Sequence, residues 1–239
     1  QIGFNAPDAA ALQRMDLASF TVDWDALRAI NPDVVGWIYV PGTTVNFPIV
    51  HGTDDEHYLK TDFYGQTSWA SFGSIFLSAA NAADFSDANN IVYGHHMNDG
   101  SMFSPFADFG DVDTFNGHRI VYVFTPTANY QLTTFSIVHC AADDPLAQTA
   151  FASEQERQAY VQDKVDRSVV TVAGLPSAAD MKHTFAFSTC DNLASNGRWV
   201  LFAYESGSTA AASSVVADDS NINPEDVAAV SEAAKETAA

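Results

Sequence analysis

The sequence predicts a mainly β protein, a closed or nearly closed barrel with peripheral helices. Short apolar runs recur along the chain, several of them alternating with polar residues, and turn-forming residues separate them. Segments with helical spacing are few. With 239 residues, 47% of them hydrophobic, the chain can enclose one sizeable core. This order of many strands and few helices is typical of a barrel.

The predicted strands follow one another along the middle of the chain. GWIYVPGTTVNFPIV predicts two strands that meet at the turn Pro41-Gly42. The last two predicted strands flank the polar loop DNLASNG. Between these pairs, single strands are expected at 73–78, 89–96, 118–125 and 130–140.

The predicted helices lie mostly at the start of the chain and late in it. The N-terminal stretch predicts one helix at 8–20 and a second that begins at the cap Thr21. The clearest helix spans 153 to about 170 and opens with a capping box formed by Ser153 and Glu156. Shorter helical or turn segments are expected at 54–63 and 101–109.

These elements divide the chain into three parts. Residues 1–33 form a helical segment that is expected to pack on the barrel, and residues 34–206 form the barrel itself. Residues 207–239 are small, polar and acidic, with Lys235 as their one base. This composition favours a flexible tail, and docking as a terminal helix is left open.

The charge balance argues against some classes of function. The chain has 30 acidic and 10 basic residues, a formal net charge of −20. Such a surface repels nucleic acid and anionic membranes, so neither is an expected partner. No run of eighteen apolar residues occurs, so no segment of this sequence is expected to span a membrane.

The two cysteines, Cys140 and Cys190, predict free thiols, although they could pair in principle. Cys140 ends the alternating run TTFSIVHC, which favours a buried, inert thiol. Cys190 ends a strand, and Arg198 begins the next one eight residues later (198 − 190 = 8). Adjacent antiparallel strands would bring these side chains together. A guanidinium favours thiolate over thiol and can donate hydrogen bonds to a developing oxyanion.

A nucleophilic cysteine needs a base or an electrostatic partner, and the chain offers seven histidines. Most lie in strands, as His139 does in a core-like alternating run, or in a short polar helix. His95 and His96 instead follow an apolar strand and precede turn residues, at the expected rim of the barrel. From their position in the sequence alone, these two histidines could equally be the polar end of a strand, with no catalytic role. A metal site with Asp99 is not favoured, because adjacent strand residues point to opposite faces.

In combination these blocks resemble class B sortases, cysteine transpeptidases of Gram-positive cell surfaces. The resemblance implies an eight-stranded barrel with N-terminal helices and a helix before the strand of the catalytic cysteine, where class A has a short connection. It runs from about residue 31 to 205 and rests on NPDVVGWIYVPGTTVNFPIVHGTDDEHYL, GSIFLS, NNIVYGHHMNDGSMF, and FSTC followed by RWVLFAYE.

The resemblance also implies the site residues. His95 matches the catalytic histidine, Cys190 the nucleophile, and Arg198 the arginine that supports the substrate and the oxyanion. The chain departs from the pattern at Asp55, where class B chains commonly have asparagine, and at Phe187, where leucine is frequent. The positions that match the substrate pocket are Tyr93, Ser188, Thr189, Leu59 and Asp55.

The implied reaction cleaves a C-terminal sorting signal at a threonine carbonyl and joins the secreted protein to a cell-wall amine through a thioacyl-enzyme. The amine belongs to a peptidoglycan precursor or, in a pilus-assembling enzyme, to a pilin lysine. A plain cysteine peptidase and a catalytically silent barrel that binds sorting signals are left open as well. The expected location is the extracellular face of the cell membrane, associated with the cell wall, with any membrane anchor outside this sequence. No cofactor and no metal are implied.

Overall fold

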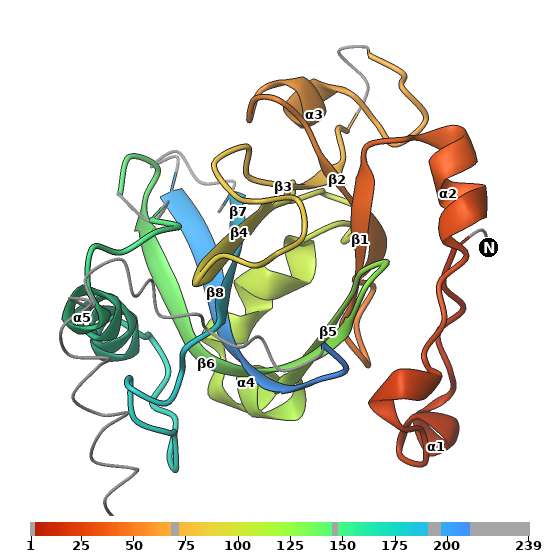
Figure 1. Ribbon diagram of the computed structural model, residues 1–239. Coiled ribbons are helices and arrows are strands. Elements are labelled where there is room, and N and C mark those ends of the chain that lie inside the picture. The colour runs from red at the N-terminus through yellow and green to blue at the C-terminus, as the bar shows by residue number, and fades with distance from the viewer. Residues whose placement is uncertain (1–2, 68–71, 145–147, 191–196, 211–239) are drawn as a thin grey trace, which may run out of the picture. The chain divides into compact units, whose positions relative to one another are not determined.

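The computed structural model describes residues 3–67, 72–144, 148–190 and 197–210, without the side chain of Cys190. Within these residues, eight strands form a closed barrel in the order β1-β2-β3-β4-β7-β8-β6-β5 (Figure 1). The predicted fold class is therefore confirmed. The predicted tail, residues 207–239, begins too early, because residues 207 and 208 are the end of β8, and its part from 211 onward lies outside the described residues. The strands are β1 (Val34–Tyr39), β2 (Asn46–His51), β3 (Ile75–Leu77), β4 (Asn89–Tyr93), β5 (Ile120–Phe124), β6 (Asn129–Ala141), β7 (Thr184–Cys190) and β8 (Gly197–Ser208).

Short helices accompany the barrel. Figure 1 shows α1 and α2 on the side of β1, and α5 on the opposite side next to β6. Helix α4 was not predicted from the sequence, and it begins where the Asp111 carboxylate accepts a hydrogen bond from the Thr114 amide at 2.9 Å. The helices are α1 (Ala9–Leu12), α2 (Trp24–Ile30), α3 (His57–Lys60), α4 (Val112–Gly117) and α5 (Glu154–Asp166), with 3₁₀ turns η1 (Leu17–Ser19) and η2 (Ser104–Gly110).

The strand register brings two chain segments to one rim of the barrel. Strands β4 and β7 are parallel, and Tyr93 is paired with Ser188. Strands β7 and β8 are antiparallel, and their last pair is Cys190 with Arg198. The ends of β4 and β7 and the start of β8 therefore meet at the same rim.

The N-terminal residues differ from the prediction in detail. The predicted helix at 8–20 is two short turns, α1 and η1, and α2 is capped by Asp23 rather than Thr21. Short helices are marginal in water, so packing decides the local conformation. Here Phe4 and Phe20 are buried against Phe124 of β5, with ring centroids 4.8 and 5.1 Å from that ring. The chain follows these contacts instead of a continuous helix.

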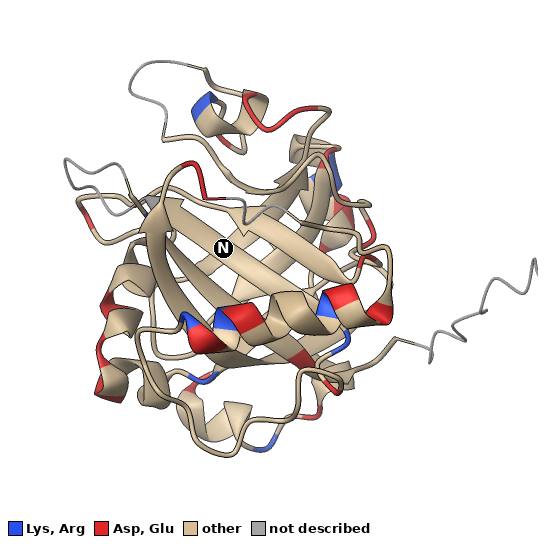
Figure 2. Cartoon of the chain, turned by 90° about the vertical axis from the view of Figure 1, so that its left-hand side faces the viewer, with Lys and Arg blue, Asp and Glu red and all other residues tan. Residues whose placement is uncertain are grey.

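Helix α5 covers the outer side of β6. Its cap is the predicted one, because the Ser153 hydroxyl accepts a hydrogen bond from the Glu156 amide at 3.2 Å. The helix ends at Asp166, earlier than predicted, because Ser168 and Val169 form hydrogen bonds to the backbone of Ile137 in β6 instead of continuing it. Figure 2 shows charges of both signs along α5, while the barrel strands behind it carry few.

Strand β6 leaves the core at its end. Residues from Phe135 to Val138 are buried, whereas His139 is exposed and stacks on Trp199 of β8, with ring centroids 4.4 Å apart. The assignment of His139 to the core was therefore wrong. The apolar pattern of β6 continued past the point at which the strand leaves the core, so the pattern alone did not show where burial ends.

A histidine–glutamate pair fixes the start of β7. The His183 Nδ1 donates to a Glu205 carboxylate oxygen at 2.6 Å, which links β7 to β8. The other ring nitrogen, Nε2, lies 2.8 Å from the Phe85 carbonyl oxygen and 2.9 Å from the Asn90 amide nitrogen of β4. These contacts join three neighbouring strands and hold the register of the strand that ends at Cys190.

The His183–Glu205 pair predicts a pH dependence of stability. The hydrogen bond from His183 lowers the pKa of Glu205 below its ordinary value of 4.5, so folding favours the ionised carboxylate. The pair therefore stabilises the fold at pH values above 4.5, the ordinary pKa of a glutamate. This stabilisation is lost as the pH falls through the lowered pKa of Glu205. In urea titrations, Glu205→Gln should therefore be destabilising at about pH 7, and this loss should shrink toward about pH 3. The exposed Glu56→Gln is the control, and an equal loss at both pH values would contradict the assignment.

Candidate active site

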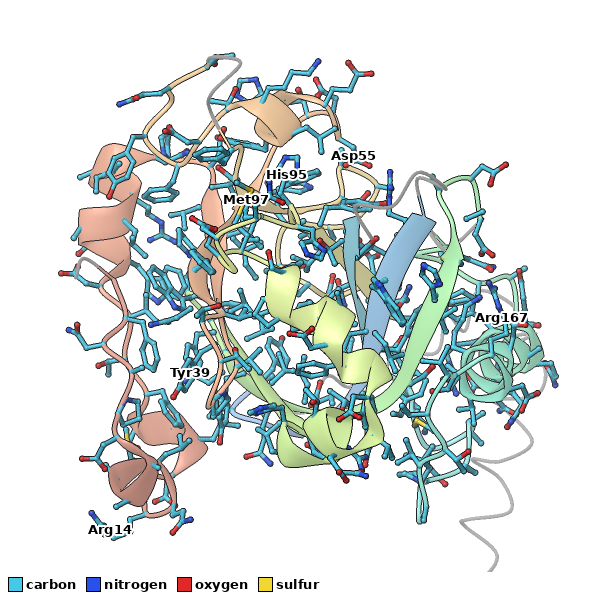
Figure 3. All side chains as sticks on the ribbon, turned by 180° about the vertical axis from the view of Figure 1, so that it is seen from behind. Arg14, Tyr39, Asp55, His95, Met97 and Arg167 are labelled. Atoms are coloured by element: carbon cyan, nitrogen blue, oxygen red, sulfur yellow. The ribbon has the colours of Figure 1, made fainter. Side chains whose placement is uncertain are left out.

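A cavity of about 240 Å³ lies at the rim where β4, β7 and β8 meet. Every predicted site residue except Cys190 lines it, and the side chain of Cys190 lies outside what the structure describes. Figure 3 shows Asp55 and His95 on the side of the barrel that carries α3, and Arg167 on the distant side next to α5. The lining residues are Asp55, Leu59, Phe76, Tyr93, Gly94, His95, Ala142, Ser188, Thr189 and Arg198.

The backbone places Cys190 and His95 at corresponding positions on neighbouring strands. In the parallel pair β4–β7, Tyr93 is paired with Ser188, and the Gly94 amide donates to the Ser188 carbonyl at 3.0 Å. His95 and Cys190 each follow two residues after that pair. Across the other edge of β7, Cys190 is paired with Arg198. The three residues predicted to be catalytic thus come from three consecutive strands of the barrel or their immediate ends.

His95 is held by a main-chain acceptor. Its Nε2 lies 2.8 Å from the Leu59 carbonyl oxygen at the end of α3. A carbonyl oxygen only accepts hydrogen bonds, so Nε2 carries the proton of this contact. The His95 carbonyl in turn accepts a hydrogen bond from the Phe103 amide at 3.0 Å, which ties the loop after β4 back onto the rim.

A single packing constraint explains the glycine before His95. A Cβ atom at Gly94 would lie 2.5 Å from the Ile75 side chain and 2.6 Å from the Phe103 ring. Both neighbours are buried, so neither can move aside freely. The backbone therefore passes close to the core immediately before His95 emerges at the rim.

Arg198 brings a positive charge to the cavity. Its Nη1 donates to the Gly197 carbonyl at 3.1 Å, and its own carbonyl accepts a weak hydrogen bond from the Cys140 thiol. The pKa of Tyr93 is raised, first by burial and then by the Asp55 carboxylate, and Arg198 offsets part of this effect. The Tyr93 phenol is therefore a protonated group in the cavity over a wide pH range.

Asp55 holds the cavity wall as well as lining it. One carboxylate oxygen accepts from the Ser78 hydroxyl at 3.0 Å, and the other accepts from the Ala79 amide at 2.6 Å. These contacts connect the segment before α3 to the end of β3. Asp55 therefore has a clear structural role, which is to hold these two segments together.

The contacts of Asp55 predict the effect of replacing it. Asp55→Ala leaves the Ala79 amide without its acceptor, and we expect kcat/KM to fall about 10-fold. Asp55→Asn should recover most of this loss, because an amide oxygen can accept from Ala79 and the Ser78 hydroxyl can accept from the amide nitrogen. Steady-state kinetics of the two variants test this, and equal losses in both would contradict it.

Ser188 and Thr189 of β7 also line the cavity. Both are buried, with exposed fractions of 6% and 2%. The Thr189 hydroxyl has no hydrogen-bond partner among the residues that the structure describes. A buried polar atom without a partner costs free energy, so this hydroxyl is a local source of instability beside the cavity.

The second cysteine lies on the other side of Arg198. Cys140 of β6 is paired with Arg198, so two strand spacings, about 10 Å, separate Cys140 from Cys190. A disulfide requires Cα atoms closer than about 7 Å, which excludes a bond between the two. Cys140 is half-buried rather than buried as predicted, because β6 leaves the core here. Burial, followed by the Asp144 carboxylate, raises the pKa of its thiol.

The described residues contain no cluster of three or more histidine, cysteine or acidic side chains that could hold a metal ion. Asp99 instead accepts hydrogen bonds from the amide and hydroxyl of Ser101, and His96 forms a backbone bridge with Met102. Both features stabilise the loop that follows His95.

Three lining residues were not predicted from the sequence. Phe76 and Ala142 show no pattern that separates them from core and turn residues, and the short apolar run of β3 only places Phe76 on a strand. The position of Gly94 before His95 is the one signal that could have been used. Leu59 also accepts the hydrogen bond of His95 through its main-chain oxygen, and no feature of the sequence indicates this contact.

Comparisons with known proteins match this arrangement. No family model matches the chain. It is 30% identical to sortase B of Listeria monocytogenes over 190 residues, which cover 77% of this chain and 76% of that protein. It is also 30% identical to sortase B of Staphylococcus aureus, over 71% of this chain and 68% of that protein.

Solved structures agree. The X-ray structure of sortase B from Clostridium perfringens has a TM-score of 0.71 at 29% identity and covers 77% of this chain and 99% of its own. A sortase B–substrate complex from Staphylococcus aureus has a TM-score of 0.69 at 28% identity. The match covers 77% of this chain and 85% of that chain.

The barrel, the cavity at its rim and these relatives define a cysteine transpeptidase of the sortase type. Within that type, the chain belongs to the class B sortases. In the described part of the chain, no helix has the length and apolar character needed to cross a membrane.

Proposed function

We propose that this sortase cleaves a C-terminal sorting signal at the carbonyl of a threonine and joins the new acyl group to an amine. First, His95 takes the proton of the Cys190 thiol, the sulfur bonds to the carbonyl carbon, the scissile C–N bond breaks, and His95 gives that proton to the leaving amine. Then His95 takes a proton from the incoming amine, whose nitrogen bonds to the same carbon as the C–S bond breaks, and this proton passes to the Cys190 sulfur. The enzyme returns to its starting state.

The strand register is the observation that carries this proposal. Cys190 is paired with Arg198, and directly opposed residues of antiparallel strands have Cβ atoms about 4.5–5.5 Å apart. His95 lines the same cavity as Arg198. A base, a cation and a thiol-bearing position around one cavity are the groups that acyl transfer through a thioester requires.

Arg198 is proposed to bind the oxyanion or the substrate backbone beside it. The negative charge that develops on the carbonyl oxygen is stabilised by preorganised donors, and a guanidinium offers several in a planar fork. The protonated Tyr93 phenol is proposed to contact the peptide, with Ser188, Thr189 and Leu59 completing the walls. Asp55 supports this wall through Ser78 and Ala79.

Secreted proteins with a sorting signal are the proposed first substrates, at the extracellular face of the cell membrane. The Staphylococcus aureus neighbour was solved as a substrate complex, which supports a peptide-binding role for the corresponding cavity here. The proposed acceptor is the amine of a peptidoglycan precursor. A pilin lysine would react by the same chemistry, so the experiment below compares the two kinds of amine.

Product analysis tests the proposed reaction. The protein is incubated with peptides of the NPxTN and LPxTG kinds, with and without an oligoglycine or lysine amine, and the products are identified by mass spectrometry. A ligated product with the amine supports the transpeptidase and identifies its motif. Hydrolysis alone, in the presence of amine, would indicate a cysteine peptidase. No cleavage, together with no labelling of Cys190 by iodoacetamide, would indicate a binding barrel.

A further inference from the structure

The contact between His95 and Leu59 fixes which ring nitrogen carries a proton. Nε2 faces the Leu59 carbonyl oxygen at 2.8 Å, and a carbonyl cannot donate. In the neutral imidazole the proton therefore lies on Nε2, and Nδ1 has the free lone pair. The hydrogen bond made by one ring nitrogen thus decides which nitrogen exchanges protons with a reacting group.

The Leu59 carbonyl occupies this position because α3 ends there. The helix has four residues, and the last carbonyls of a helix have no partner within it. The His57 carbonyl accepts from the Thr61 amide at 3.1 Å, and the Tyr58 carbonyl accepts from the Ser74 amide at 2.9 Å. The Leu59 carbonyl is the next one along the helix, and it accepts its hydrogen bond from His95.

Gly73 lies directly against these carbonyls. A Cβ atom at this position would lie 2.6 Å from the Tyr58 oxygen, 2.7 Å from the Leu59 oxygen and 2.9 Å from the Leu59 carbonyl carbon. All three are main-chain atoms, so no flexible side chain can move aside to relieve the contact. The φ angle of Gly73 is +63°, a conformation that glycine adopts most readily.

We propose that Gly73 is a positioning residue for the reaction. Its missing side chain lets the Leu59 carbonyl approach His95, which keeps the proton on Nε2 and commits Nδ1 to proton transfer with the leaving and incoming amines. The inference rests on the proposed role of His95. Gly73 is not among the residues that line the cavity of His95, and it is proposed to act through the Leu59 carbonyl alone.

The first test needs no substrate. ¹⁵N NMR of the unsubstituted protein reports which imidazole nitrogen is protonated, and the spectrum of His95→Gln identifies the His95 signals. The expected result is the tautomer protonated at Nε2. A neutral His95 protonated at Nδ1 would overturn the inference, whether or not any peptide is turned over, so this result is independent of the proposed function.

The second test uses a pair of glycine substitutions. Gly73→Ala pushes on the Leu59 carbonyl, whereas Gly65→Ala, at φ +77°, has the same unfavourable backbone angle with no atom within 4 Å of the added Cβ. We expect Gly73→Ala to lower kcat about 10- to 100-fold with little change in KM, and to populate the other tautomer of His95. Gly65→Ala should leave kcat, KM and the tautomer as they are.

Melting temperatures of the two variants separate this role from a loss of folding. Both substitutions place alanine at positive φ, which should lower the melting temperature by about 2–4 °C, and Gly73→Ala should lower it further because its Cβ also meets main-chain atoms. A folded Gly73→Ala with an unchanged tautomer overturns the inference, even if kcat falls. If Gly73→Ala does not fold, the tautomer of the unsubstituted protein decides the matter.

Discussion

Replacing Cys190 by alanine is expected to abolish the covalent adduct with a sorting-signal peptide and to lower kcat/KM by about 10⁴-fold or more. The thioacyl-enzyme cannot form without the sulfur, and the remaining groups can only bind the peptide. Binding itself should persist, because the cavity is lined by other residues. Stopped-time mass spectrometry for the adduct and fluorescence anisotropy for peptide binding measure the two effects separately.

Cys140→Ala is the matched control for this substitution. Cys140 is paired with Arg198 from the opposite side and is the only free cysteine among residues whose side chains the structure describes. It does not line the cavity, so the variant should form the adduct at the normal rate. Loss of the adduct in Cys140→Ala with its retention in Cys190→Ala would reverse the assignment of the nucleophile.

Replacing Arg198 by lysine is expected to lower kcat/KM by about 10²- to 10³-fold while the charge is kept. An ammonium cannot reproduce the planar fork of a guanidinium, so hydrogen bonds to the oxyanion are lost or misdirected. The loss should appear mainly in kcat if Arg198 acts on the transition state, and mainly in KM if it holds the substrate backbone. Steady-state kinetics with one peptide measures this division.

Arg28→Lys provides the control for Arg198→Lys. Arg28 is exposed in the last turn of α2, and the same substitution there should leave kinetics and stability close to the starting values. Near-normal kinetics in Arg198→Lys would contradict the assigned role, and a similar loss in both variants would point to a general effect of the substitution.

Most of the barrel could be predicted because its signals are local. The turn at Pro41-Gly42 and the alternation in the apolar runs each depend on residues close in sequence, and Gly42 has the expected positive φ of 78°. The position of Arg198 opposite Cys190 could also be predicted, because a single loop joins their strands. Local pattern and strand order therefore indicated both the architecture and the approximate site.

Features set by tertiary packing could not be predicted. The N-terminal helix broke into turns because Phe20 is buried on the barrel, and α5 ended early because Ser168 bonds to β6. The acceptor that holds His95 is the main-chain oxygen of Leu59, 36 residues away in sequence (95 − 59 = 36). A carbonyl is present in every residue, so no choice of side chain marks the one that is used.

Cys190 is proposed to form the acyl-enzyme in a cavity shared with His95 and Arg198, and mass spectrometry of the intact protein can detect that species. The protein is incubated with sorting-signal peptides, and proteolysis then locates the adduct. We expect an added acyl group on Cys190, lost when an amine is supplied and absent in Cys190→Ala. An adduct on Cys140, or turnover of a peptide by Cys190→Ala, would show that Cys190 is not the nucleophile.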